Sequence, residues 1–194
     1  MAKRQFLRLE DGGGDTDQGL VRSSIEPVGD VMWLDSLKDG RRAKKPPGTP
    51  RFRISPPLPC VEDMPWCGMA YVVSERFRKL LKEKAPGHAQ FFKAEVTGPK
   101  KQVAMLAPAL PYHVVNWLHV VDCIDMKKSE YDADDDGEGE YLFSRVVLDA
   151  TRVPEDVLIF RLRQDETTTM IDAALAKKIR KAGITGPQFY NLNL

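Results

Sequence analysis

The residues with the most obvious chemistry lie in one acidic segment, Ser129–Tyr141. Its carboxylates occupy positions 1, 3 and 5 of a twelve-residue calcium loop, and a glycine occupies position 6. Position 12, which should supply a bidentate glutamate, is Phe143. The spacing leaves three interpretations open: a calcium-responsive loop, a solvated hairpin loop, or an acidic surface that meets a basic partner. The acidic residues are Glu130, Asp132, Asp134, Asp135, Asp136, Glu138 and Glu140.

A second group of ligand-capable side chains lies near the middle of the chain. On a strand, four of them would point to one side of the sheet and Asp122 to the other. A zinc or iron site needs a closer pair together with distant ligands, and the chain offers only His88 beyond this group. We therefore expect histidines held by hydrogen bonds, with no metal and no cofactor. The group consists of His113, His119, Asp122, Cys123 and Asp125.

A cysteine–histidine nucleophile is an enzymatic alternative. Cys123 or Cys67 could meet His119 or His88 in space, and the sequence would not show the contact. Neither cysteine has a local signature, and the sequence contains no GxSxG, Walker, HExxH or GxGxxG motif. We expect no enzymatic activity; a small hydrolase using a Cys/His or metal site around His119–Asp125 remains the alternative.

The composition is typical of a soluble globular protein. The chain has 194 residues, of which 42% are hydrophobic and 29% charged, enough apolar mass for one core. Its net charge of +1 gives no general argument for nucleic acid, and no apolar run is long enough for a signal peptide or a membrane span. The three cysteines form no CxxC pair, which indicates reduced thiols and a cytoplasmic location.

The elements that must position these residues are organised around the apolar stretch Tyr112–Asp125. Its β-branched and aromatic residues favour a central strand, and its length indicates a bend or bulge. A helix is the alternative, because Val114, Leu118 and Val121 also lie at helical spacing.

Two strand–helix–strand units are predicted on either side of this stretch. In the first, the strand Met69–Val73 leads to the N-cap Ser74 and an amphipathic helix over 75–84, followed by a strand over 90–96. In the second, Asp172 caps a helix over 172–182 that ends at a glycine, and a strand follows. A shift of ninety-eight positions aligns the two units without a gap. The similarity reflects either a duplication or two independent solutions of one local problem.

The remaining segments complete an α+β fold with a mostly antiparallel or mixed sheet. Residues 1–60 are expected to hold short strands and a basic, proline-rich connector, and residues 61–194 an α+β domain, together forming one compact unit. The connector Lys38–Pro59 has six prolines and seven Lys or Arg residues, which favours extended structure and a solvated linker. Further strands are predicted at Gln5–Leu9, Val31–Leu34, Arg51–Ile54, Tyr141–Leu148 and Val157–Leu162.

Several short motifs, in this order and spacing, resemble a bacterial immunity-protein family of polymorphic toxin systems, immunity family eleven, formerly a domain of unknown function. The resemblance covers about residues 65–190. The motifs are Val73-Ser74-Glu75-Arg76-Phe77, Ala85-Pro86-Gly87 with Gln90-Phe91, Val115-Asn116, Val121-Asp122-Cys123-Ile124-Asp125-Met126, Ser129, Leu148-Asp149, Ile159-Phe160-Arg161 and Ala182-Gly183-Ile184-Thr185-Gly186.

The resemblance implies an intracellular antitoxin that binds the effector domain of a toxin encoded nearby and occludes it. It implies no catalytic residue, no cofactor, no nucleic-acid partner and no membrane partner. A basic toxin active site would suit the acidic segment, and Trp33, Trp66 and Tyr141 are candidate anchors, although we expect the tryptophans in the core. The predicted partner-binding residues are Asp132, Asp134, Asp135, Asp136, Glu138, Glu140 and Tyr141.

Overall fold

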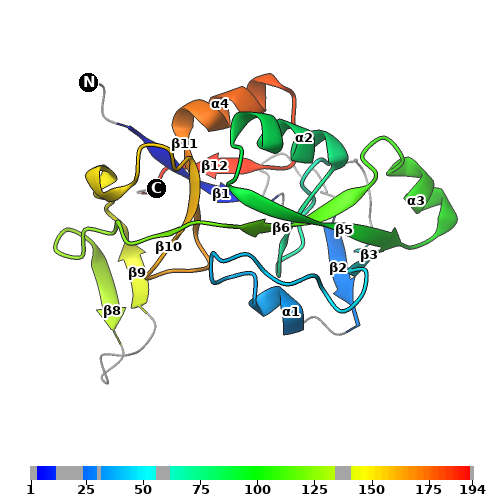
Figure 1. Cartoon of the computed structure of the whole chain (residues 1–194), viewed down its shortest axis with the longest axis horizontal. Helices are drawn as coiled ribbons and strands as arrows, with labels where there is room; N and C mark the ends of the chain where they lie inside the picture. The colour runs from blue at the N-terminus through cyan, green and yellow to red at the C-terminus, as the bar shows by residue number, and fades with distance from the viewer. Residues whose placement is uncertain (1–3, 12–23, 30–31, 56–61, 134–140, 193–194) are drawn as a thin grey trace.

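The computed structural model describes residues 4–11, 24–29, 32–55, 62–133 and 141–192. Within these ranges the chain forms two five-stranded sheets, a separate two-stranded hairpin and four α-helices (Figure 1). The α+β class predicted from the sequence is confirmed, and both large sheets are mixed. None of the helices in this part of the chain has the length and apolar character needed to cross a membrane.

The first sheet brings the two ends of the chain together. In spatial order its strands are β12 (Gln188–Tyr190), β1 (Phe6–Glu10), β11 (Thr169–Asp172), β10 (Ile159–Leu162) and β7 (Val120–Val121). All neighbours are antiparallel except β10 and β7, which run parallel. β10 is buried at all four positions, Arg161 included, so both faces of this strand are covered. The N-terminal strand β1 thus lies between two strands from the last quarter of the chain.

The second sheet is built from the middle of the chain. In spatial order its strands are β2 (Ser24–Val28), β3 (Arg51–Ser55), β5 (Ala89–Thr97), β6 (Tyr112–Trp117) and β4 (Tyr71–Val73). β3 and β5 are parallel, and the other neighbours are antiparallel. Strands were predicted at the positions of β3, β4, β5 and β6, and these predictions are confirmed.

The stretch Tyr112–Asp125 is extended, so the strand prediction is confirmed and the helical alternative is wrong. It does not form one strand. β6 pairs in the second sheet, the chain then leaves the strand at Leu118 and His119, and β7 pairs in the first sheet. At the break, the Leu118 amide donates to the His88 carbonyl. This segment therefore passes from one sheet into the other.

Two amphipathic helices, α2 (Glu75–Lys84) and α4 (Ala173–Lys181), confirm the two predicted helices. Ser74 Oγ accepts a hydrogen bond from the amide of Phe77, and Asp172 caps α4 in the same way. Both helices pack their apolar faces into one core with Trp117 of β6, and Figure 1 shows them together on one side of the molecule. The shared apolar residues of the two helices are Phe77, Leu81, Leu175, Ala176 and Ile179.

The prediction of a strand at Val31–Leu34 is wrong. Residues Met32–Asp35 form a single helical turn, α1, and Val31 lies outside the described residues. Leu34 is buried against the second sheet's core, and the turn continues into Leu37 through backbone bonds. Spacing three apart places both leucines on one side of a helical turn, which a short apolar run cannot distinguish from a strand. A further helix, α3 (Lys100–Met105), was not predicted.

The described part of the basic connector, residues 38–55, contains the predicted strand as β3 and is held against the second sheet. Asn116 Nδ2 donates to the carbonyl of Arg41, and the Gln90 amide exchanges two hydrogen bonds with the backbone of Ala43. Phe52 and Ile54 of β3 are buried in the second sheet's core. Side-chain amides of β5 and β6 thus replace the hydrogen bonds that an irregular segment lacks.

Candidate partner-binding surface

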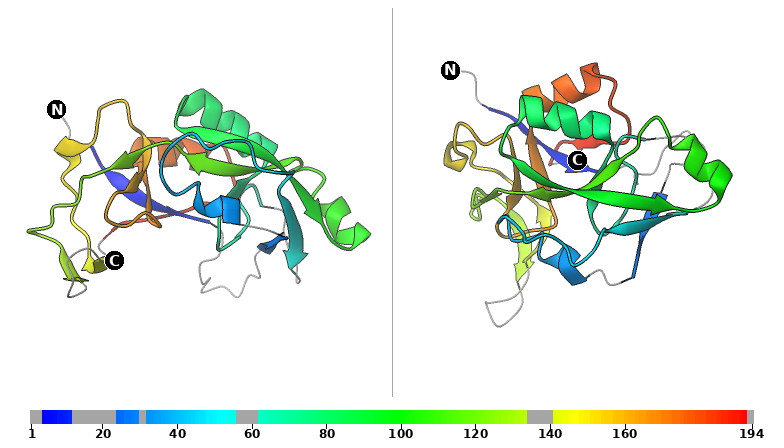
Figure 2. Two further views of the ribbon diagram at one scale, coloured as in Figure 1. Left: turned by 60° about the horizontal axis from the view of Figure 1, so that its bottom comes forward. Right: turned by 45° about the vertical axis from the view of Figure 1, so that its right-hand side comes forward.

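The acidic segment predicted to bind a partner belongs to a β-hairpin, β8 (Glu130–Ala133) and β9 (Tyr141–Arg145). Figure 2 shows it at the periphery of the molecule in both views. Of the seven predicted partner-binding residues, only Asp132 and Tyr141 lie in the described part of the chain. The other five, Asp134, Asp135, Asp136, Glu138 and Glu140, lie outside it.

One face of the hairpin is aromatic. Tyr131 lies 5.3 Å from Tyr141 and 5.6 Å from Phe143, measured between ring centroids. Phe143 also packs against the core beneath β7 and β10, so it attaches the hairpin to the body of the protein. The Tyr131 side chain remains 38% exposed. The aromatic face therefore both holds the hairpin in place and offers tyrosine surface to a partner.

The other face combines a carboxylate with an exposed leucine. Asp132 is paired in register with Leu142, and both side chains are exposed, Leu142 to 68%. At the base of the hairpin the Glu130 carboxylate lies 3.2 Å from the Arg145 guanidinium. Leu142 was not among the predicted partner-binding residues, although its position between Tyr141 and Phe143 places it on the opposite face of a strand from those two aromatic residues.

Position 12 of the calcium-loop pattern is Phe143, whose ring packs against other aromatic rings. It contacts Tyr131 and Tyr141 and has no side-chain oxygen that could bind calcium. Asp134, Asp136 and Gly137, which would supply or shape the middle of that loop, lie outside the described residues. The structure therefore adds no ligand to those that the sequence offered.

The cysteines proposed as nucleophiles are both buried. Burial raises the pKa of the Cys123 thiol to about 12 and that of the Cys67 thiol to about 11. A nucleophilic cysteine needs a lowered pKa, because only the thiolate attacks. Neither residue meets that requirement at neutral pH, which disfavours the cysteine hydrolase alternative.

The two histidines of that alternative do come together, but in a structural arrangement. The rings of His88 and His119 lie 4.8 Å apart. His88 Nε2 lies 2.9 Å from the Leu158 amide nitrogen and 3.1 Å from the Asp156 carbonyl oxygen, and Nδ1 lies 3.0 Å from the Pro86 carbonyl oxygen. Burial, and then the neighbouring His88, lower the pKa of His119. His88 thus joins the turn after α2 to the chain before β10.

The remaining members of the predicted group are separated. His113 on β6 lies 3.6 Å from the Glu75 carboxylate, and burial lowers its pKa. Asp122 accepts from Gln164 and pairs with Arg152 at 3.0 Å. Asp125 pairs with Lys128 at 2.7 Å within one turn. Across the described ranges, no three His, Cys, Asp or Glu side chains are grouped closely enough to hold a metal ion.

The tryptophans divide between core and surface. Trp117 is fully buried, and Trp33 packs edge-on against Phe92 with 5.7 Å between ring centroids. Trp66 is 43% exposed and stands at the edge of a cavity of about 520 Å³ that also includes the buried Arg161. The expectation that Trp66 lies in the core is wrong, and no pattern in the sequence indicated that Arg161 would lie at this cavity.

Comparison with known proteins identifies a family. A family model described as an immunity protein family (Imm11) matches residues 18–193. No curated protein matches the chain.

Proposed function

Because the chain belongs to the Imm11 immunity protein family, we propose that it binds one cognate toxin protein and neutralises it by covering the toxin's working surface. The observation that carries this proposal is the family match over residues 18–193. Families of this kind have toxins as partners and generally act without catalysis. The toxin is encoded nearby, and the two proteins meet in a bacterial cytoplasm.

The β8–β9 hairpin supports a role in binding. Protection requires slow dissociation, which buried anchor residues surrounded by a polar rim provide. Leu142 and Tyr131 are exposed side chains of the kinds that bury area in a complex, and Asp132 lies beside Leu142. The hairpin is thus a projecting element with anchors on both faces and an acidic connection between its strands.

The charge of that connection suits a basic toxin surface. Clustered carboxylates increase the rate of encounter with a positive patch and disfavour wrong partners. An enzyme that acts on an anionic substrate, such as a nuclease, has such a patch at its active site. The acidic segment covers that active site in our proposal.

The first experiment is co-purification of the tagged chain with the product of the adjacent reading frame. We expect a one-to-one complex, sensitive to salt, whose formation abolishes the toxicity of that product. A folded chain that binds none of the neighbouring products would contradict the proposed function.

The second experiment neutralises the acidic connection. Changing Asp134, Asp135 and Asp136 to Asn should slow association at low salt by roughly tenfold and flatten its salt dependence, measured by stopped-flow mixing. The matched control changes three exposed glutamates elsewhere, Glu83, Glu95 and Glu155, to Gln, which alters the net charge equally. Equal effects of the two triple variants would show that total charge, rather than the hairpin, steers the encounter.

The third experiment tests the anchor. Leu142→Ala should accelerate dissociation by roughly tenfold without changing stability, because the side chain is exposed in the free protein. Met105→Ala on α3 is the control, since Met105 is also an exposed large hydrophobic residue, at 44%. An unchanged dissociation rate for Leu142→Ala would remove this face of the hairpin from the interface.

A further inference from the structure

The cavity between the two sheets contains the guanidinium of Arg161, a buried charge with no ion-pair or hydrogen-bond partner among the described residues. Arg161, on β10, is only 7% exposed, and its Nε atom is buried with no hydrogen bond among the described residues. No ion pair or hydrogen bond of its guanidinium is formed within this part of the chain either. Burial lowers its pKa, and electrostatic interactions with Tyr71, Glu166 and Asp39 act in the opposite direction. A buried guanidinium without a counter-ion is costly, so the fold retains it at the expense of stability.

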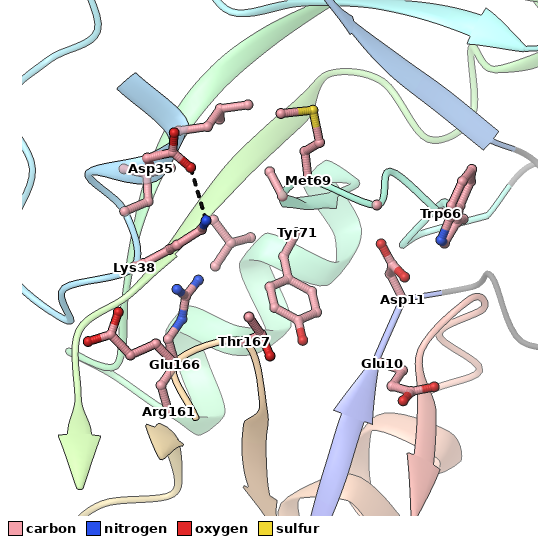
Figure 3. Close-up of a pocket in the computed structure, with 15 residues that line it drawn as sticks. Glu10, Asp11, Asp35, Lys38, Trp66, Met69, Tyr71, Arg161, Glu166 and Thr167 are labelled. Carbon is pink, nitrogen blue, oxygen red and sulfur yellow. Dashed lines mark ion pairs between the residues drawn. The ribbon is translucent and has the colours of Figure 1, made fainter. Parts of the chain in front are cut away.

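The Arg161 side chain points into the cavity. In Figure 3 its guanidinium is drawn below the ammonium of Lys38 and to the left of Tyr71, while the Lys38 ammonium is directed at Asp35. Lys38 pairs with Asp35 at 3.0 Å, so it has further donors to offer. Two cationic side chains that line one cavity can together bind an anion.

The rest of the lining limits which anion can enter. Four carboxylates lie around the cavity, which opposes a polyanion such as nucleic acid or a dianionic phosphate. The guanidinium fork matches a carboxylate with two parallel hydrogen bonds. The other walls are apolar or aromatic, with Leu34, Leu37, Val115 and Trp66 among them. A volume of about 520 Å³ is in the range of small-ligand sites.

We propose that this cavity is a binding site for a monocarboxylate with an apolar body, whose carboxylate is held by Arg161 and Lys38. The carboxylate comes either from a free small molecule or from the partner toxin, as an acidic side chain or a chain end inserted past Trp66. The second source rests on the proposed function; the first does not. In both cases the ligand supplies the counter-ion that the Arg161 guanidinium lacks.

The first test uses the isolated protein. Titration with 3-phenylpropionate, followed by calorimetry and by the melting temperature, should show binding, whereas uncharged 3-phenylpropanol and dianionic phenyl phosphate should bind at least tenfold more weakly. Arg161→Met should weaken 3-phenylpropionate at least tenfold while keeping or raising the melting temperature, because a buried unpaired charge is removed. Lys38→Met should weaken it less, since Lys38 is partly solvated and already paired.

The control is Arg163→Met. Arg163 is an exposed arginine two positions along the chain from Arg161, so this variant removes the same charge outside the cavity and should leave the titration unchanged. Arg161→Lys is the second variant if the methionine variant fails to fold; a lysine keeps the charge but loses the fork, and should bind several-fold more weakly.

The second test uses the complex with the toxin. If the partner supplies the carboxylate, Arg161→Met should weaken the complex at least tenfold, Arg163→Met should not, and 3-phenylpropionate should compete with the toxin. Probe binding with an unchanged complex would assign the cavity to a small molecule. Absence of probe binding together with an Arg161→Met complex of normal affinity would overturn the proposal. If no toxin complex forms, the proposed function fails and the titration alone decides about the cavity.

Discussion

The β4–α2–β5 and β11–α4–β12 units have the same topology. In each, a strand leads through a capped helix to a second, parallel strand, and an antiparallel strand lies between the two. The intervening strand is β6 in the first unit and β1 in the second. One follows its unit in the chain, and the other precedes its unit by most of the sequence. The likeness of the two segments therefore extends to the positions of their strands in the sheets, but the intervening strand is recruited differently.

The two units differ in what covers their helix caps. Ser74 is fully buried, and its hydroxyl donates to the Asp63 carboxylate at 2.5 Å, whereas the Asp172 cap is partly open to solvent. Asp63 also accepts from Arg76 and from the amide and hydroxyl of Thr185, in the turn after α4. One carboxylate thus joins the start of α2 to the end of the second unit. We therefore expect the buried Ser74 cap, which shares Asp63 with the second unit, to contribute more to stability than the Asp172 cap.

The largest expected effects come from the equivalent core positions of the two helices. Phe77→Ala should cost about 3–5 kcal/mol and Leu175→Ala about 2–5 kcal/mol, since both side chains are buried in one cluster. Urea unfolding of each variant measures these losses. Lys79→Ala, on the exposed face of α2, is the control. A loss below about 1 kcal/mol at either position would mean that the unit concerned does not depend on the shared core.

Asp63 should come next. Asp63→Ala should cost about 3 kcal/mol, because it leaves the buried Ser74 hydroxyl and the Thr185 amide without their acceptor. Chemical denaturation gives the loss in stability. Hydrogen exchange should show the turn after α4 opening together with the start of α2. Loosening confined to one unit would show that the carboxylate does not couple them.

The same carboxylate should give the protein a stability that depends on pH. Burial alone would raise the pKa of Asp63, but hydrogen bonds from Arg76 and Ser74 outweigh it and hold the pKa below its ordinary value. A lowered folded-state pKa contributes stability that is present above the unfolded value of 3.8 and is lost as the pH falls through the folded value. Between pH 6 and pH 3, the free energy of unfolding should therefore fall more steeply with decreasing pH for the wild type than for Asp63→Asn. Parallel curves for the two proteins would contradict this.

The two caps should differ from each other. Ser74→Ala should cost about 2 kcal/mol, because it removes the cap and also takes one hydrogen-bond donor away from the buried Asp63 carboxylate. Asp172→Ala should cost about 1 kcal/mol, as expected for the loss of a helix cap alone. Thermal unfolding of the pair measures the difference. Equal losses would mean that burial adds nothing to the cap of α2.

The smallest effects should be equal in the two units. Gly87 after α2 and Gly183 after α4 both have positive φ, +80° and +67°, and a Cβ at either would meet open space. Changing either to Ala should cost about 1 kcal/mol, entirely from backbone strain. Melting temperatures of the two variants should match, and a larger loss at one of them would indicate a contact specific to that unit.

Local signals explain why so much of the fold could be predicted. Caps such as Ser74 and Asp172 and the apolar stripes between them depend only on neighbours in sequence, so both helices were found with their starts within a residue. The break at Leu118 could not be found this way, because it reflects a change of sheet that depends on where β10 lies. The single turn of α1 was misassigned because four residues do not separate a helical from an extended period.

The candidate site was less predictable because it depends on burial. The composition of the acidic segment was visible, and so was the failure of Phe143 as a ligand. The exposure of Leu142 depends on which face of β9 is turned away from the core. That Arg161 has no partner among the described residues depends on which charged side chains lie near it in space. Sequence spacing records neither.

The place of β1 sets the timing of folding during synthesis. This strand is synthesised long before its partners on both sides, β11 and β12. At about 5–20 residues per second, roughly 10 to 40 s pass between the synthesis of β1 and of β12. The middle of the first sheet therefore cannot close in step with translation. Until β11 and β12 are made, β1 is an unpaired strand that chaperones or neighbouring chains can bind.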